Sequence, residues 1–511
     1  MKHHRLAFAL LLLVLFPVTA NAQADLSDLE AYFEEARAEW DIPGMAVAIV
    51  KDGEIVHVGG YGVLKKGGAE EVDANTQFAI ASNTKAFIAA SLASLVDQGK
   101  ISWDDPIKKH LPYFQLVDEV ATQRATVRDA LSHATGLGTY SGDVIWYNSD
   151  HTAEEILRHA AHLEPAFEFR SGYGYSNLMF IAAGEVIRAA SGLSWDEYIE
   201  RHIFTPLEMR NSITDADEAG NNAATPHKIS NGENQSLELV SWTAMGSGAA
   251  AGIMSTATDM AKWVNLQLNE GTHDGEVIFS EAAQQQMWHP HFNYSVTPST
   301  RETYPGRNFS GYGLAWGTSE YRGHFMAAHG GAYDGMYSRV AMVPDEELGV
   351  VVLTNTMKGI STWLIYDIVD AFLGDSVRDW SAYGLEGDNR GKAAFAARMN
   401  EFRDARVEGT TPALSTADIE GTYHDDLYGD FEVRMEGDTL RLLFPRAEGL
   451  NATLEHFHYD TYEIKWDVKH SWFDFGTVQF ESNHKREVIG ISFSVPNEDI
   501  FFEEIEAKKM K

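Results

Sequence analysis

The stretch FAIASNTKAFIAASLASLVDQ, residues 78–98, predicts how the centre of this chain folds and which chemistry it carries. A short apolar segment of strand type comes first and an apolar helix follows, with Ser82 and Lys85 where the helix begins. Side chains three residues apart share one face of a helix, with their Cβ atoms about 5–6 Å apart. Burial favours the neutral form of a lysine, which can then take a proton from a hydroxyl. The stretch therefore predicts a serine nucleophile with a lysine as its proton acceptor.

The spacing Ser-x-x-Lys alone is a weak signal, because the chain contains it twice. The second copy, Ser482-Asn483-His484-Lys485, lies in a polar segment between two expected strands. The serine and the lysine would not share a helical face there, so we expect no function for this copy.

A second motif, Tyr175-Ser176-Asn177, supplies a phenol and an amide. A tyrosine beside a Ser/Lys pair can relay a proton to a leaving group, and Asn177 can bind the lysine and the substrate. The alternative is an ordinary loop in which the asparagine caps the next helix. Tyr173 is a rival for the role of Tyr175.

The third motif, His329-Gly330-Gly331, follows an apolar segment that we expect to be a strand. A strand edge beside the nucleophile can bind the backbone of a substrate, and glycines let that substrate approach closely. The same His-x-Gly spacing recurs at residues 57–59 and 273–275. The first copy lies before the helical block and the second lies in an expected loop, so we expect no function for either.

In this order, the three motifs resemble those of the serine β-lactamase and penicillin-binding protein superfamily. The match is best to the class C-like branch with Y-x-N and H-x-G, which includes D-aminopeptidases and related esterases. Segments at residues 41–44, 126–137 and 252–260 also look like this branch. The resemblance spans about residues 30–375. It implies an α+β fold with a β-lactamase/transpeptidase-like antiparallel sheet and a helical domain.

The resemblance implies catalytic roles for the matching residues. Ser82 would be acylated, Lys85 would activate it, Tyr175 would act as acid and base, and Asn177 would orient the lysine and the substrate. His133 lies in a segment, residues 132–136, that is similar to a family motif, and we expect a structural role for it. No motif places an acidic residue as the base for deacylation.

The resemblance also implies where substrate binds. His329 would stand in place of the lysine of the K-T-G motif, with Gly330 and Gly331 beside it. The backbone N–H groups of Ser82 and Ala332 would form the oxyanion hole. Because His replaces Lys, recognition of a substrate carboxylate would be weaker than in true β-lactamases, which favours neutral or free-amine peptides and esters.

The two ends of the chain differ from the middle. Residues 1–22 combine a basic start, an apolar run and a small-x-small cleavage site, which predicts a signal peptide and a periplasmic or secreted protein. The alternative is an uncleaved membrane anchor, for which the apolar run is short. Residues 23–374 form the expected hydrolase domain. Residues 375–412 are a polar connector with one short helical segment.

From residue 413 to residue 511 the sequence alternates apolar and polar residues between turn signals. This pattern predicts an all-β barrel or sandwich of about 100 residues. It resembles the lipocalin-like barrel appended to some peptidases of this branch.

The composition and the motifs that are missing exclude several classes of function. The 511 residues include no cysteine, which excludes disulfides and thiolate catalysis. The formal net charge of −35 repels phosphate backbones, so we expect no nucleic-acid partner. The chain lacks the motifs H-E-x-x-H and G-x-S-x-G, which argues against zinc peptidases and α/β-hydrolases. We expect no cofactor and no metal.

The leading hypothesis is an exported serine hydrolase that forms an acyl-enzyme at Ser82 and acts on small peptides or amides. One alternative is a carboxylesterase or weak β-lactamase of the same fold. Another is a penicillin- or peptide-binding receptor without turnover, but binding alone needs neither Lys85 nor Tyr175. The oligomeric state does not follow from the sequence.

Overall fold

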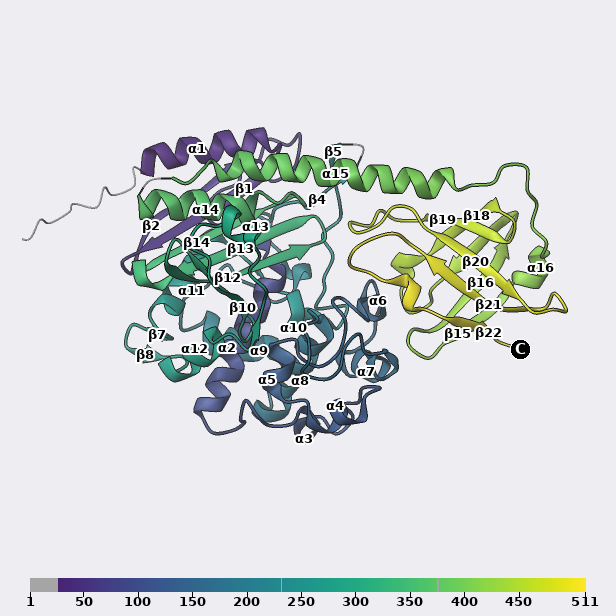
Figure 1. The fold of residues 1–511 in the computed structure, drawn as a ribbon, viewed down its shortest axis with the longest axis horizontal. Helices are drawn as coiled ribbons and strands as arrows, with labels where there is room; N and C mark the ends of the chain where they lie inside the picture. Colours follow the sequence, from purple (N-terminus) through teal and green to yellow (C-terminus); the bar gives the residue numbers. More distant parts are fainter. Residues whose placement is uncertain (1–25, 231, 375) are drawn as a thin grey trace, which may run out of the picture.

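The computed structural model describes residues 26–230, 232–374 and 376–511 (Figure 1). The predicted signal peptide, residues 1–22, lies outside the described residues. Within the described ranges, no helix has both the length and the apolar character needed to cross a membrane.

An antiparallel eight-stranded sheet organises the first part of the chain, in the order β2-β1-β14-β13-β12-β11-β10-β9. Its strands are β1 (Gly44–Lys51), β2 (Glu54–Gly62), β9 (Phe292–Asn293), β10 (Ser310–Tyr312), β11 (Gly317–Tyr321), β12 (His324–Tyr333), β13 (Met336–Val343) and β14 (Leu348–Thr354). Met45 in β1 pairs with Thr354 in β14, so sheet segments from before and after the helical block meet. This confirms the predicted α+β sheet with a helical insertion.

Helices cover both faces of this sheet (Figure 1). On one face lie α1 (Leu26–Glu39) and α14 (Ile360–Leu373), packed on Val47 and Ile49 of β1. On the other face lies α11 (Ala257–Leu268), together with the rest of the helical block. Strand β1 is apolar as far as Val50 because neighbouring residues along a strand point to opposite faces, and here both faces are buried.

Along the chain, the helical block lies between β2 and β9, except for α13, which follows β9. Its helices are α2 (Thr84–Asp97), α3 (Ile107–His110), α4 (Glu119–Arg124), α5 (Val127–Leu131), α6 (Asp143–Trp146), α7 (Ala153–His159), α8 (Asn177–Ser191), α9 (Trp195–Ile199), α10 (Gly248–Ala251), α12 (Glu281–Trp288) and α13 (Pro298–Thr303). Both long helices that carry predicted site residues, α2 and α8, are buried along most of their length and pack on each other.

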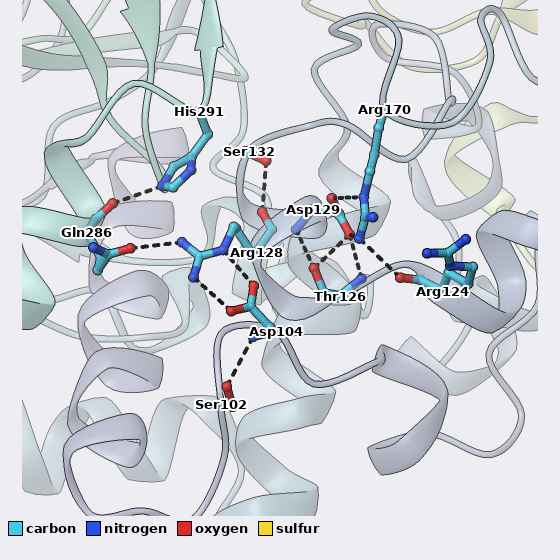
Figure 2. Close-up of polar contacts among 10 residues, drawn as sticks. All are labelled: Ser102, Asp104, Arg124, Thr126, Arg128, Asp129, Ser132, Arg170, Gln286 and His291. Carbon is cyan, nitrogen blue, oxygen red and sulfur yellow. Dashed lines mark hydrogen bonds and ion pairs between the residues drawn. The ribbon is translucent and has the colours of Figure 1, made fainter.

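A polar network fixes the turn that precedes the second motif (Figure 2). Thr126 and Asp129 form a capping box at the start of α5. Arg170, on the loop that leads to Tyr175, donates to both carboxylate oxygens of Asp129 at 2.8 and 2.7 Å. A bidentate pair of this kind adds geometric definition as well as energy. The network therefore links α5, and His133 just after it, to the loop that carries the tyrosine.

The run YGLAWG at residues 312–317 has the length and apolar character of a buried strand, so the sequence predicts a strand there. The structure has a tight turn there, between β10 and β11, closed by a 2.7 Å hydrogen bond from the N–H of Gly313 to the carbonyl of Trp316. Leu314 and Trp316 are buried in the core. The residues are apolar because the turn inserts into the core, and this produces the same pattern as a buried strand.

The C-terminal part is a closed barrel with the strand order β15-β16-β17-β18-β19-β20-β21-β22. Its strands are β15 (Gly421–Asp425), β16 (Gly429–Glu436), β17 (Thr439–Leu443), β18 (Ala452–His458), β19 (Thr461–Trp466), β20 (Thr477–Ser482), β21 (Val488–Ser494) and β22 (Ala507–Lys509). Helix α15 (Trp380–Asp404) runs along α14 and leads toward the barrel (Figure 1). It is longer than the single short helical segment expected in the connector.

Candidate active site

Ser82 lies in a single 3-10 turn, Ala81–Asn83, between β3 (Phe78–Ala79) and α2. Strand β3 pairs with β6 (Met254–Ser255), and the N–H of Ile80 donates to the carbonyl of Ile253 at 3.0 Å. Ala81 has φ +50°, a left-handed conformation that a non-glycine residue adopts only under constraint. The chain therefore turns sharply at the nucleophile before the helix begins at Thr84.

Lys85 is fully buried, and its Nζ makes three hydrogen bonds. It donates to Ser82 Oγ at 3.0 Å, to Asn177 Oδ1 at 2.7 Å and to the carbonyl of Ala250 at 2.9 Å. The amide and carbonyl oxygens can only accept. A neutral Lys85 therefore keeps its two N–H groups on them, and its lone pair points at the hydroxyl of Ser82.

Burial makes this neutral form accessible. It lowers the pKa of Lys85 to about 7, although the charge of Asp143 acts in the opposite direction. An amine with a pKa near neutrality can both take and return a proton. The pair is therefore suited to activating the serine.

Asp143, at the start of α6, fixes the amide of Asn177. Asn177 Nδ2 donates to Asp143 Oδ2 at 2.7 Å, while Trp146 Nε1 donates to the other carboxylate oxygen at 2.9 Å. The amide oxygen of Asn177 must then face Lys85. Burial raises the pKa of Asp143 to about 8, and the two hydrogen bonds oppose that shift. Asp143 belongs to no motif, so sequence analysis did not find it.

Tyr175 stands over the same lysine. The centre of its ring is 4.8 Å from Lys85 Nζ. Burial raises the pKa of Tyr175 well above its usual range, and a hydrogen bond with Ser82 opposes the shift. The phenol is therefore protonated at neutral pH and can donate. Tyr173 packs instead against the rings of Phe292, Tyr294 and Tyr312, and it does not line the cavity at Ser82.

His329 is held by a hydrogen-bonded chain of buried side chains. The N–H of Ser176 donates to His133 Nδ1 at 3.0 Å, so the proton of His133 is on Nε2. The hydroxyl of Tyr312 lies 3.3 Å from that atom and 3.1 Å from His329 Nε2. His329 Nδ1 then donates to the carbonyl of Gly330 at 2.6 Å. Both nitrogens of His329 thus have partners within the protein.

Burial also lowers the pKa of His329 to about 3, so this imidazole is neutral at physiological pH. The sequence pattern placed His329 at the end of a strand. In the structure it lies in the middle of β12. The side chain therefore supplies no positive charge to the site. Its hydrogen bond to the carbonyl of Gly330 instead fixes the backbone at the edge of the strand.

The glycines of the third motif bring β12 close to the nucleophile. Strand β11 pairs with β12 only as far as Ala328, which leaves the edge at residues 330–332 open toward the cavity. A Cβ atom at Gly331 would lie closer than 3.0 Å to the carbonyl oxygen of Ile80. Only glycine at this position lets the strand pass beside the turn at Ser82.

A cavity of about 340 Å³ joins these groups. Its lining includes Ser82, Tyr175 and Asn177, and the glycine edge with Ala332. The structure thus brings every predicted site residue except Lys85 to one cavity wall, with Lys85 buried directly behind Ser82. The second Ser-x-x-Lys copy is elsewhere, at the end of β20 and in the turn after it.

The barrel also reaches this cavity, which the sequence did not indicate. Trp472, Asp499 and Ile500 contribute to its lining. The loop that carries Asp499 follows β21. Burial raises the pKa of Asp499 to about 7, and the charge of Glu498 adds to the effect. Across the described ranges, no group of three or more His, Asp or Glu side chains is arranged to hold a metal ion.

A serine beside a buried lysine and a tyrosine, at the open edge of a sheet with a helical insertion, defines the β-lactamase and transpeptidase class of serine hydrolases. The family model described as Beta-lactamase matches residues 29–370, and the chain belongs to this family. A second model, described as a domain of unknown function (DUF3471), matches residues 405–509.

The relatives with curated names include a hydrolase and a penicillin-binding protein. The unguisins hydrolase ungD' of Aspergillus campestris is 29% identical over 78% of this chain and 76% of its own length. Penicillin-binding protein 4 of Amycolatopsis lactamdurans is 26% identical over 67% of this chain and 88% of its own. Among solved structures, the octameric penicillin-binding protein homologue from Pyrococcus abyssi aligns with a TM-score of 0.61 at 20% identity, covering 95% of this chain and all of that one.

Proposed function

We propose that this protein is an exported serine hydrolase that forms an acyl-enzyme at Ser82 and cleaves small peptides or amides. The observation that carries the proposal is the arrangement at Lys85. Its Nζ has two partners that only accept and a third, Ser82 Oγ, at 3.0 Å that can donate. Binding a ligand without turnover needs no such arrangement, which argues against a receptor.

In the proposed acylation, Ser82 Oγ attacks the carbonyl carbon and its proton passes to Lys85 Nζ. The carbonyl oxygen becomes an oxyanion that the N–H groups of Ser82 and Ala332 stabilise. The C–N bond then breaks, and the leaving amine takes a proton from the phenol of Tyr175, which regains one from Lys85. Water hydrolyses the ester at Ser82 by the reverse sequence of proton transfers, and the acid is released.

The open edge of β12 supports a peptide or amide substrate. An extended substrate can pair with residues 330–332 by strand addition, which places its carbonyl at Ser82. A carboxylesterase or a weak β-lactamase would use the same residues. The shape of the cavity decides which of the three substrate classes is cleaved: peptides or amides, esters, or lactams. The names of the relatives, a hydrolase of unguisins and a penicillin-binding protein, fit an acyl-transfer reaction.

The barrel, which we propose as a lipocalin-like domain at residues 413–511, contributes to substrate binding. It supplies Trp472, Asp499 and Ile500 to the cavity wall. On this view, residues 23–374 carry the reaction, residues 375–412 connect the two parts, and the signal at residues 1–22 directs export.

The test is covalent labelling combined with turnover. A fluorophosphonate or a fluorescent penicillin should modify the peptide that contains Ser82, as mapped by mass spectrometry. Ser82→Ala should abolish hydrolysis of acyl-peptide and anilide substrates and keep the melting temperature of the parent. Ser482→Ala is the matched control and should retain full activity. Turnover at the parental rate in Ser82→Ala would refute the proposal.

A further inference from the structure

One buried histidine holds the loop of Tyr175 from both sides. The N–H of Gly174 donates to the carbonyl of His133 at 3.1 Å, and the N–H of Ser176 donates to its Nδ1 at 3.0 Å. The imidazole of His133 also packs against the phenol of Tyr175, with the ring centres 4.4 Å apart. His133 therefore contacts the backbone on each side of Tyr175 as well as its ring.

The backbone of His133 is in an uncommon conformation. Its φ is +60°, in the left-handed region that few residues other than glycine adopt. Such a conformation costs free energy and persists where the surrounding contacts over-determine it. Here those contacts are the two hydrogen bonds to the loop of Tyr175 and a third on the far side of the imidazole.

That third contact is with Tyr312, the last residue of β10, which connects His133 to the third motif. Its hydroxyl accepts from His133 Nε2 at 3.3 Å and donates to His329 Nε2 at 3.1 Å, and His329 Nδ1 donates to the carbonyl of Gly330. A backbone N–H can only donate, so the donor at Ser176 fixes the direction of every later link. The chain runs one way, from the second motif to the open edge of β12.

The two middle members of this chain do not reach the substrate side. His133 is 0% exposed and Tyr312 is 4% exposed, and neither lines the cavity at Ser82. Burial lowers the pKa of His133 well below its usual range and raises the pKa of Tyr312 well above its own, so both are neutral at physiological pH. Any influence of these side chains on a reaction at Ser82 must pass through Tyr175 and His329.

We propose that His133 and Tyr312 are positioning residues of the hydrolase site, whose hydrogen-bonded chain holds the phenol of Tyr175 and the open edge of β12 at a fixed separation. The inference rests on the proposed function, in which Tyr175 protonates the leaving amine of a substrate that lies along residues 330–332. The proton donor and the substrate are then held by separate segments of the chain. A misplacement of about 1 Å between such groups can cost as much as about 10²-fold in rate.

The first test removes one oxygen atom. Tyr312→Phe keeps the ring and leaves Nε2 of both histidines without this partner. We expect kcat/KM for an acyl-peptide anilide to fall about tenfold, and kcat/KM for the nitrophenyl ester of the same acyl group to fall about threefold or less. The difference arises because the leaving amine needs a proton from Tyr175 and a nitrophenolate does not. A smaller fraction of folded protein would lower both rates equally.

Tyr423→Phe is the matched control. It removes a similarly buried hydroxyl, which donates to the carbonyl of Ile419 in the barrel at 2.6 Å. This variant should keep both rates of the parent. Both tyrosine variants should still take a fluorophosphonate on Ser82.

A double-mutant cycle tests whether Tyr312 acts through His329. His329→Gln breaks the last link of the chain. In Tyr312→Phe/His329→Gln, kcat/KM for the anilide should match that of the more impaired single variant, because a chain already broken at one link gains nothing from a second break. Effects that multiply would show that the hydroxyl acts independently of His329.

The tautomers of the two histidines test the direction of the chain in the parent protein. Long-range proton–nitrogen spectra of protein with isotope-labelled histidine should show His133 protonated on Nε2 and His329 protonated on Nδ1. Spectra of His133→Gln and His329→Gln identify the two signals. In Tyr312→Phe the signal of His329 should move toward the other tautomer.

Four results would each overturn the proposal: parental rates in folded Tyr312→Phe, equal losses for the anilide and the ester, multiplied effects in the double variant, or the opposite tautomers in the parent. Where melting temperatures show that Tyr312→Phe does not fold, the tautomers of the parent decide. Failure of the hydrolase function is seen separately, as absence of label on Ser82 in the parent.

Discussion

Glu504, in the barrel, accepts a hydrogen bond of 2.6 Å from the hydroxyl of Ser141 in the hydrolase part. Its other carboxylate oxygen accepts from the N–H of Gly142 at 2.8 Å. The next residue is Asp143, which orients Asn177 toward Lys85. The barrel is thus linked to Lys85 through Ser141, Gly142 and Asp143, three consecutive residues that end in the first turn of α6, and through Asn177.

Removing this link should impair catalysis. Glu504→Ala leaves the buried donors of Ser141 and Gly142 without a partner, at a cost of about 1–3 kcal/mol. We expect kcat/KM to fall about tenfold as Asp143 shifts, and the pH profile to change with it. Glu506→Ala, at an exposed glutamate two residues later, is the control and should match the parent. An unchanged pH profile and rate in Glu504→Ala would show that the loop is positioned without the barrel.

The pH dependence of activity should report Lys85. The lysine must be neutral to accept the proton of Ser82, so kcat/KM should rise with pH and level off above an apparent pKa of about 7. Asp143 titrates in the same pH range, because burial raises its pKa to about 8, and in its ionised form it raises the pKa of this lysine. Asp143→Asn removes this ionisable group and should move the acid limb modestly to lower pH, together with a loss of rate from the displaced amide. A shift of the limb to higher pH would contradict this account.

The close approach of β12 to the nucleophile should not tolerate a side chain at residue 331. A methyl group there would overlap the carbonyl of Ile80 and the hydroxyl of Ser338. We expect Gly331→Ala to cost about 1–3 kcal/mol of stability and to lower kcat/KM at least tenfold. In contrast, Gly391→Ala in α15 meets open space and should stabilise the helix by up to about 1 kcal/mol. Thermal unfolding and steady-state kinetics measure both effects, and equal behaviour of the two variants would refute the argument.

Short sequence motifs were sufficient to predict those parts of the site whose residues are neighbours along the chain. Ser82 and Lys85 share one turn, the alternation of apolar and polar residues predicted the barrel, and the resemblance of the three motifs to a known family implied the sheet. Asp143 could not be predicted in this way, because its importance depends on a partner that only the tertiary fold brings near. Its carboxylate meets Asn177, the first residue of another helix.

The long helix α15 shows a different limit. Its first half contains Gly384, Gly387 and Gly391, which lower helix propensity and favoured a shorter helix in the sequence analysis. At Gly384 a Cβ atom would lie closer than 3.0 Å to the ring of Trp363 in α14. Packing between two helices therefore requires the glycine that argued against a helix, and tertiary contact overrides propensity here.

The loop that carries Asp499 belongs to the barrel, whereas the nucleophile and its proton acceptor belong to the other half of the molecule. The proposed reacting groups and part of the wall that a substrate would meet are thus encoded in separate stretches of the gene. On the proposed function, substitutions of Asp499 or Ile500 change the wall that a substrate meets and leave Ser82 and Lys85 in place, provided that the contacts of Glu504 with Ser141 and Gly142 are kept. Conversely, a version truncated after α14 would lack Trp472, Asp499 and Ile500 in the wall of the cavity, and its substrate preferences would not represent those of the intact chain.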